Sequence, residues 1–98
     1  MPTEMHLQMA KALRLVRPMI EQRRWTYICW ALGTVCEDNP SLIHAVCRTR
    51  AWIYAQLRGY SIYEDWARST VGHCPTKDEA RRARLAWIDW MISDLEKE

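Results

Sequence analysis

The stretch WTYICWALGTVC, residues 25–36, carries no charge in a chain in which 27% of the residues are charged. It is too short to cross a membrane, since a helical span needs about 20 apolar residues. A helix that is apolar on all sides is typical of one surrounded by others. The sequence therefore predicts that residues 25–36 form the central helix of a core, and it predicts no membrane segment.

Cap and turn residues outside this run predict further helices. Thr3 can cap a first helix that runs towards Arg17. Pro18 lacks an amide donor and is expected to end or kink that helix, or to be the first residue of the next one. An Asn-Pro dipeptide then opens a helix of about residues 40–58, which Gly59 closes.

Two capping boxes predict the remaining helices. Ser61 with Glu64 opens a short helix, and Thr76 with Glu79 opens a last helix that runs towards the end of the chain. No strand alternation is present. The prediction is one all-α domain, residues 1–98, built as a compact bundle of four to five helices around residues 25–36.

The charge balance is too close to neutral to imply a polyanionic partner. Lys and Arg number 14 against 12 Asp and Glu, so the formal net charge is +2. The first residues, which include Glu4 and His6, do not form an export signal. The four cysteines are accordingly expected to be free thiols in a cytoplasmic protein.

The cysteines and histidines do not have the spacing of a metal site. Cys29 and Cys36 are two helical turns apart, about 10 Å along the axis, which is too far for one zinc ion. The other possible ligands form two pairs: His44 with Cys47, and His73 with Cys74. Without a C-x-x-C pair, the sequence predicts no metal and no cofactor.

No catalytic arrangement is evident either. His73 and Cys74 are neighbours in sequence, and adjacent side chains point apart instead of pairing as base and nucleophile. Each of the three glycines stands alone, so there is no phosphate-binding loop. The chain is predicted not to be an enzyme.

Nucleic-acid binding is an alternative that the sequence leaves open. The helix 40–58 and the short helix after it have the proportions of a helix-turn-helix. Acidic Glu64 and Asp65 occupy the first turn of the would-be recognition helix, where they repel phosphates. The residues that could contact phosphates are basic: Lys11, Arg14, Arg17, Arg48 and Arg58.

The helix 40–58 carries a tryptophan on what the helical angles predict to be its outer face. Its predicted apolar stripe is Ile43, Val46, Cys47, Ile53, Tyr54 and Leu57. Trp52 points away from that stripe, on an outer face that it shares with Arg48, Thr49 and Gln56. An outward tryptophan beside an arginine is typical of a protein interface, and the alternative is packing under the amino-terminal helix.

An arginine stands within the same stripe. Arg50 is expected either to extend its guanidinium to the surface or to pair with a carboxylate, of which Asp65 and Asp89 are candidates.

The last helix is apolar over more than one face. Its main stripe is Ala80, Ala83, Trp87, Trp90, Met91 and Leu95. Leu85, Ile88 and Ile92 broaden it, which predicts a second face for a partner, with a homodimer expected. The alternative is that a small domain buries this helix deeply.

Three segments resemble small helical proteins of tailed phages and prophages: Tyr27 to Leu32, Ser61 to Trp66 and Arg84 to Leu95. The resemblance implies a bacterial cytoplasm and an accessory role in which a host protein is bound and modulated or inhibited. Together with the residue patterns, it predicts a non-enzymatic protein-protein interaction protein, with the nucleic-acid regulator as the alternative.

Overall fold

The computed structural model describes residues 2–22, 27–57, 59–60 and 63–97, with the side chains of residues 63 and 64 excepted. Its elements are five α-helices and one 3-10 turn: α1 (Glu4–Gln22), α2 (Ile28–Asp38), η1 (Pro40–Leu42), α3 (Ile43–Gln56), α4 (Tyr63–Val71) and α5 (Lys77–Leu95). The described ranges contain no strand, and the all-α prediction is confirmed.

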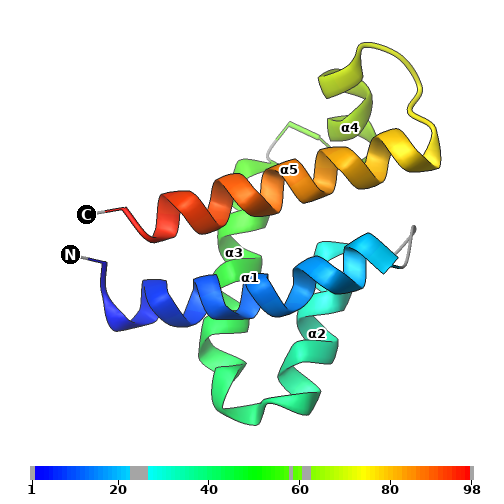
Figure 1. Ribbon diagram of the computed structural model, residues 1–98. Coiled ribbons are helices and arrows are strands. Elements are labelled where there is room, and N and C mark those ends of the chain that lie inside the picture. The colour runs from blue at the N-terminus through cyan, green and yellow to red at the C-terminus, as the bar shows by residue number, and fades with distance from the viewer. Residues whose placement is uncertain (1, 23–26, 58, 61–62, 98) are drawn as a thin grey trace.

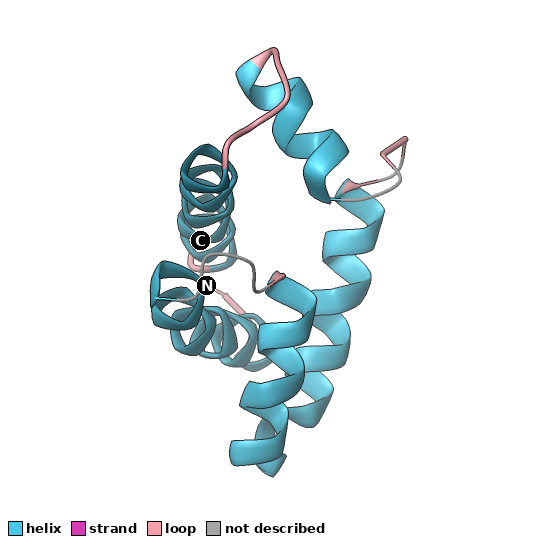
Figure 2. Ribbon diagram, turned by 90° about the vertical axis from the view of Figure 1, so that its right-hand side faces the viewer, coloured by secondary structure: helices cyan, strands magenta, loops and turns pink. Residues whose placement is uncertain are grey.

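The helices form two pairs that lie across one another. α1 and α5 run antiparallel, so the beginning of α1 lies beside the end of α5 (Figure 1). α2 and α3 form a second antiparallel pair, which crosses behind the first (Figures 1 and 2). α4 packs on the first half of α5. The core lies where the two pairs face each other.

The helix nearest the centre of this arrangement is α1. It packs against α2, α3 and α5, and six of its residues are buried: Met9, Ala10, Ala12, Leu13, Val16 and Ile20. Pro18 lies within α1, and the helix continues to Gln22. Two of the alternatives are therefore wrong: Pro18 neither ends the first helix near Arg17 nor begins the next one. Pro18 is exposed, so its ring needs no room in the core.

The uncharged stretch forms α2 at its described positions, but the other helices do not enclose it. Ile28, Leu32 and Val35 are buried in the core. Trp30 is 71% exposed. The prediction that this helix is surrounded on all sides is wrong at this face, because a two-layer arrangement leaves one side of α2 open.

Local end signals are confirmed where the structure describes them. Thr76 Oγ1 accepts from the Glu79 amide at 3.1 Å, and Glu79 Oε1 accepts from the Thr76 amide at 3.0 Å. Gly59 follows α3 with a φ of 93°. Asn39 does not cap α3; its Nδ2 donates to the Val35 carbonyl of α2 at 3.1 Å. The Ser61–Glu64 box lies outside the described residues.

Candidate protein-binding groove

The orientation of α3 differs from the predicted one. Ile43 and Tyr54, placed in the apolar stripe by the helical angles, are 49% and 62% exposed, and Cys47 is also exposed. Thr49, assigned to the outer face, is fully buried. Its Oγ1 donates to the Ala45 carbonyl at 2.7 Å. A threonine that satisfies its hydroxyl within its own helix can occupy a core position, and the helix is rotated accordingly.

Trp52 consequently lies at the edge of the core and does not point away from it. It is half-buried and packs against the core. Its ring lies 6.0 Å from the ring of Trp90 on α5, with the two planes 31° apart. Trp90 is 50% exposed. The two tryptophans therefore form a partly exposed aromatic pair that joins α3 to α5.

Two depressions lie beside this pair, where α1 begins, α3 passes and α5 ends. The larger, of about 370 Å³, is lined by Thr3, Met5, His6, Met9, Arg48, Ala51 and Trp52. The smaller, of about 210 Å³, is lined by His6, Met9, Trp52, Asp94 and Leu95. Since His6, Met9 and Trp52 border both, the depressions are neighbours. We call them together the Trp52 groove.

The charges around the Trp52 groove are unequal. Arg48 is exposed on its α3 side and makes no hydrogen bond or ion pair with any described residue. Asp94, on the α5 side, forms an ion pair with Lys97 at 3.8 Å. The groove thus combines apolar and polar walls with one cation that no described carboxylate pairs with.

The predicted second face of the last helix is not available to a partner. Ile88 and Ile92 are buried in the core, and Leu85 is half-buried against it. Gln56, predicted at the α3 surface, accepts a hydrogen bond from Trp87 Nε1 at 3.1 Å. The alternative of deep burial therefore describes α5 at these positions, although Trp90 of the main stripe is 50% exposed. A homodimer remains a prediction without this support.

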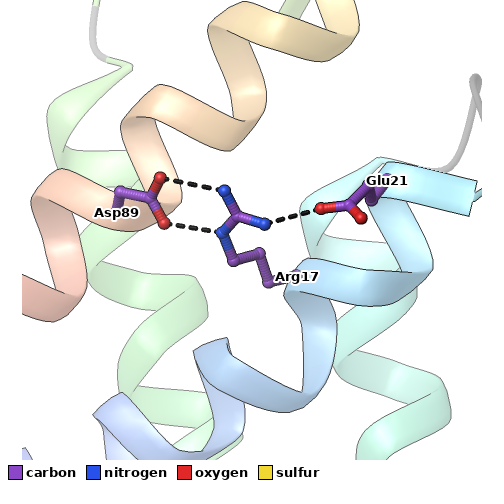
Figure 3. A network of polar contacts seen from close by, with 3 residues as sticks. All are labelled: Arg17, Glu21 and Asp89. Atoms are coloured by element: carbon purple, nitrogen blue, oxygen red, sulfur yellow. Dashed lines mark hydrogen bonds and ion pairs between the residues drawn. The ribbon is translucent and has the colours of Figure 1, made fainter.

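The basic residues proposed for phosphate contact are partly neutralised. Arg17 Nε and Nη2 donate to the two carboxylate oxygens of Asp89 at 2.7 and 3.2 Å, and Nη1 donates to Glu21 at 2.7 Å (Figure 3). Arg14 pairs with Glu96 at 2.6 Å. Lys11 is exposed. Arg58 lies outside the described residues.

These contacts shift the pKa values of the two carboxyl groups. Hydrogen bonding from Arg17 lowers the pKa of Asp89, and hydrogen bonding from Arg14 lowers the pKa of Glu96. Both arginines therefore join α1 to the end of α5 through ion pairs, which makes them less available for phosphate contact than the sequence indicates.

The short helix does not resemble a DNA-reading element. α4 packs on α5, where Trp66 lies 4.7 Å from Trp87, ring to ring. Asp65 in its first turn pairs with Arg68 at 3.4 Å. An acidic first turn opposes approach to phosphates, as the sequence indicates.

The predicted thiols and metal ligands lie apart. Cys29 is buried, Cys36 half-buried, and Cys47 and Cys74 exposed, all as free cysteines. Within the described part of the chain, no three His, Cys, Asp or Glu side chains gather as a metal site. His73 Nε2 lies 3.2 Å from Glu79 Oε2.

Arg50 bonds to backbone instead of a carboxylate. Its Nη2 donates to the Cys29 carbonyl at 2.9 Å. The predicted partners are engaged elsewhere, Asp65 with Arg68 and Asp89 with Arg17. Arg50 is half-buried and lies across the α2–α3 contact.

Other exposed apolar side chains lie on α2 and α3. Trp30 contacts Tyr27 edge-on, with the ring centroids 5.7 Å apart. On α3 the exposed side chain is Tyr54, whose pKa is raised by the neighbouring Cys29 of α2. Neither Trp30 nor Trp90 lines a depression, but Trp90 lies against Trp52, which borders both, so Trp30 serves as the control for Trp90.

Sequence reasoning found Arg48 and Trp52 but missed His6, Met9 and Trp90. Met9 is buried and Trp90 is 50% exposed, and both stand in stripes that predict core burial, so periodicity gives no sign of the groove beside them. The groove combines three distant segments, and only the packing of three helices brings them together.

Comparison of the chain with protein-family models, curated proteins and solved structures finds no match. No described helix has the length and apolarity needed to cross a membrane.

Proposed function

We propose that this chain is a non-catalytic protein that acts by binding another protein at the Trp52 groove. The observation that carries the proposal is the half-exposed Trp52–Trp90 pair beside two adjoining depressions. Aromatic and methionine side chains are enriched at protein interfaces, and Met adapts its shape to a partner. Met5 and Met9 supply that adaptability.

The proposed mode of action is that this chain occupies a surface of its partner. A bound partner would be blocked or held in one conformation without any chemical turnover. The resemblance to phage and prophage helical proteins supports a bacterial host protein as the partner and the bacterial cytoplasm as the location. Nucleic-acid binding is the less supported alternative, because Arg14 and Arg17 are paired with carboxylates.

The test is affinity capture from bacterial lysate with four forms of the chain: wild type, Trp90→Ala, Arg48→Glu and Trp30→Ala. The same protein should be retained by the wild type and Trp30→Ala, and lost from Trp90→Ala and Arg48→Glu. All three residues are exposed or half-exposed, so the variants should fold, which circular dichroism checks.

Two results would contradict the proposal. A partner lost only from Trp30→Ala would place the interface on α2. Retention of nucleic acid that weakens steeply with salt would favour the alternative function, since phosphate contacts release counterions.

A further inference from the structure

We infer that the Trp52 groove takes a short amphipathic helix that places two apolar side chains in the depressions and a carboxylate against Arg48. The inference rests on the proposed function and names the chemistry of its partner. It follows from the number of depressions, from the walls of the groove and from its charge.

The two depressions indicate two anchoring side chains. They share His6, Met9 and Trp52 as walls, so their occupants are close neighbours. On a helix, side chains three or four positions apart have Cβ atoms about 5–6 Å apart and point to the same side. Recognition of a helix in a groove uses this spacing. The unequal volumes, about 370 and 210 Å³, favour a large anchor and a smaller one.

The walls favour a helix over an extended peptide. The lining residues from Met5 to Met9 and from Arg48 to Trp52 lie in α1 and α3, and Asp94 and Leu95 lie in α5. The backbone of the α3 wall is paired within its helix, and only the first turn of α1 and the last turn of α5 present unpaired backbone groups, so the groove offers mainly side chains and no strand edge. An extended peptide gains its affinity from backbone hydrogen bonds to a sheet edge, and the described residues contain no strand. A helical partner has already satisfied its own backbone hydrogen bonds and needs none from the groove.

The charge favours an acidic partner. Arg48 lines the larger depression and has no carboxylate among the described residues. Asp94 lines the smaller depression, but Lys97 compensates it. A carboxylate within one turn of the large anchor can reach the guanidinium. Such an exposed pair changes affinity about two- to fivefold, so Arg48 serves selectivity and the anchors supply most of the affinity.

The experiment uses a displayed library of helix-forming peptides of 16 residues, randomised on one face and selected on the purified chain. Enriched peptides should share two apolar residues three or four positions apart, with Asp or Glu within one turn of them. A representative peptide is then synthesised, and its dissociation constant is measured by fluorescence anisotropy against the wild type, Arg48→Glu, Trp90→Ala and Trp30→Ala.

The acidic peptide should bind Arg48→Glu about tenfold more weakly, and exchanging its carboxylate for lysine should restore the affinity for that variant. Trp90→Ala should weaken binding about thirtyfold, as at an interface hot spot, and Trp30→Ala should leave it unchanged. A proline between the two anchors should abolish binding, because it breaks the helix.

The failures are distinguishable. The inference would be overturned if the enriched peptides had no acidic residue, or if Arg48→Glu bound the peptide as tightly as the wild type. In either case, weaker peptide binding by Trp90→Ala would still support the groove as the binding site. A peptide that tolerates proline would also overturn the inference. The inference also fails if no peptide is enriched. If the dissociation constant is the same for Trp90→Ala and the wild type, the inference fails and the groove is also not the site of the proposed function.

Discussion

At Gly33 the absence of a side chain makes room for a guanidinium. A Cβ atom at this position would lie 2.8 Å from Arg50 Nη2, which donates to the Cys29 carbonyl. Gly33→Ala gains about 1 kcal/mol of helix propensity and displaces a hydrogen bond worth about 1 kcal/mol. We expect the free energy of unfolding, measured by urea denaturation, to change by less than about 0.5 kcal/mol, since the two effects offset each other.

The control for this prediction is the same substitution in an Arg50→Met background. With no guanidinium to displace, Gly33→Ala should there stabilise the chain by about 1 kcal/mol. Equal stabilisation in both backgrounds would show that the flexible end of Arg50 moves aside without loss.

The residue scale also shows why helical angles misplaced the faces of α3. An apolarity count puts Ile43 and Tyr54 inside and Thr49 outside, yet the reverse is observed. The count treats threonine as polar, although its hydroxyl bonds to the Ala45 carbonyl and leaves a methyl group for the core. It also assigns one buried face to a helix that packs on both α1 and α2.

At the scale of the element, Pro18 is a removable weakness in α1. It lacks the amide that would donate to the Arg14 carbonyl, at a cost of about 3 kcal/mol in a helix interior. Replacement by alanine also makes the unfolded chain more flexible, which offsets about 0.4–1 kcal/mol of the gain in stability. We expect Pro18→Ala to raise the free energy of unfolding by about 2 kcal/mol by urea denaturation. A loss of stability would show that the proline shapes the contact between α1 and α5.

The capping box of α5 permits a second prediction for an element. Thr76→Ala removes the acceptor for the Glu79 amide and should lower the free energy of unfolding by about 1 kcal/mol, measured by thermal and urea denaturation. Thr70→Ala is the matched control, because its hydroxyl bonds only to the Trp66 carbonyl within α4. It should change stability by less than about 0.5 kcal/mol. Equal losses for the two variants would contradict a capping role for Thr76.

These two elements show what local sequence can predict. A cap acts over three residues, so Thr76 and Glu79 identify the start of α5 without knowledge of the fold. Pro18 disfavours a helix locally, but burial of Val16 and Ile20 on either side outweighs that preference. Local signals therefore predict an element best when no buried residue opposes them.

At the scale of the whole molecule, the sequence predicts the all-α class because caps and apolar spacing recur along the chain. It does not predict the Trp52 groove, whose walls come from residues 3–9, 48–52 and 94–95. Their meeting depends on how the α1–α5 pair crosses the α2–α3 pair. That crossing is set by many side-chain contacts at once, and no single segment encodes it.

The same α1–α5 pair should make the molecule sensitive to acid. Arg17 lowers the pKa of Asp89, and Arg14 lowers that of Glu96. The folded pKa of each group is therefore below its unfolded value, about 3.9 for Asp and 4.3 for Glu. The stabilisation is fully present above these unfolded values and is lost as the pH falls through the folded ones, because the protonated carboxyl no longer pairs with arginine.

Asp89→Asn tests this linkage, since it keeps the shape of the side chain and removes its charge. Because the pair is about half-exposed, we expect a loss of only about 0.5–1 kcal/mol at pH 7. The loss should shrink as the pH falls from 7 to 2.5, because the wild-type carboxyl takes up a proton as the pH passes through its lowered folded pKa, as urea midpoints across the range would show. Asp94→Asn, whose ion pair with Lys97 joins no two helices, should change little at either pH. A loss for Asp89→Asn that is the same at both pH values would mean that shape and hydrogen bonding, and not charge, hold α1 to α5.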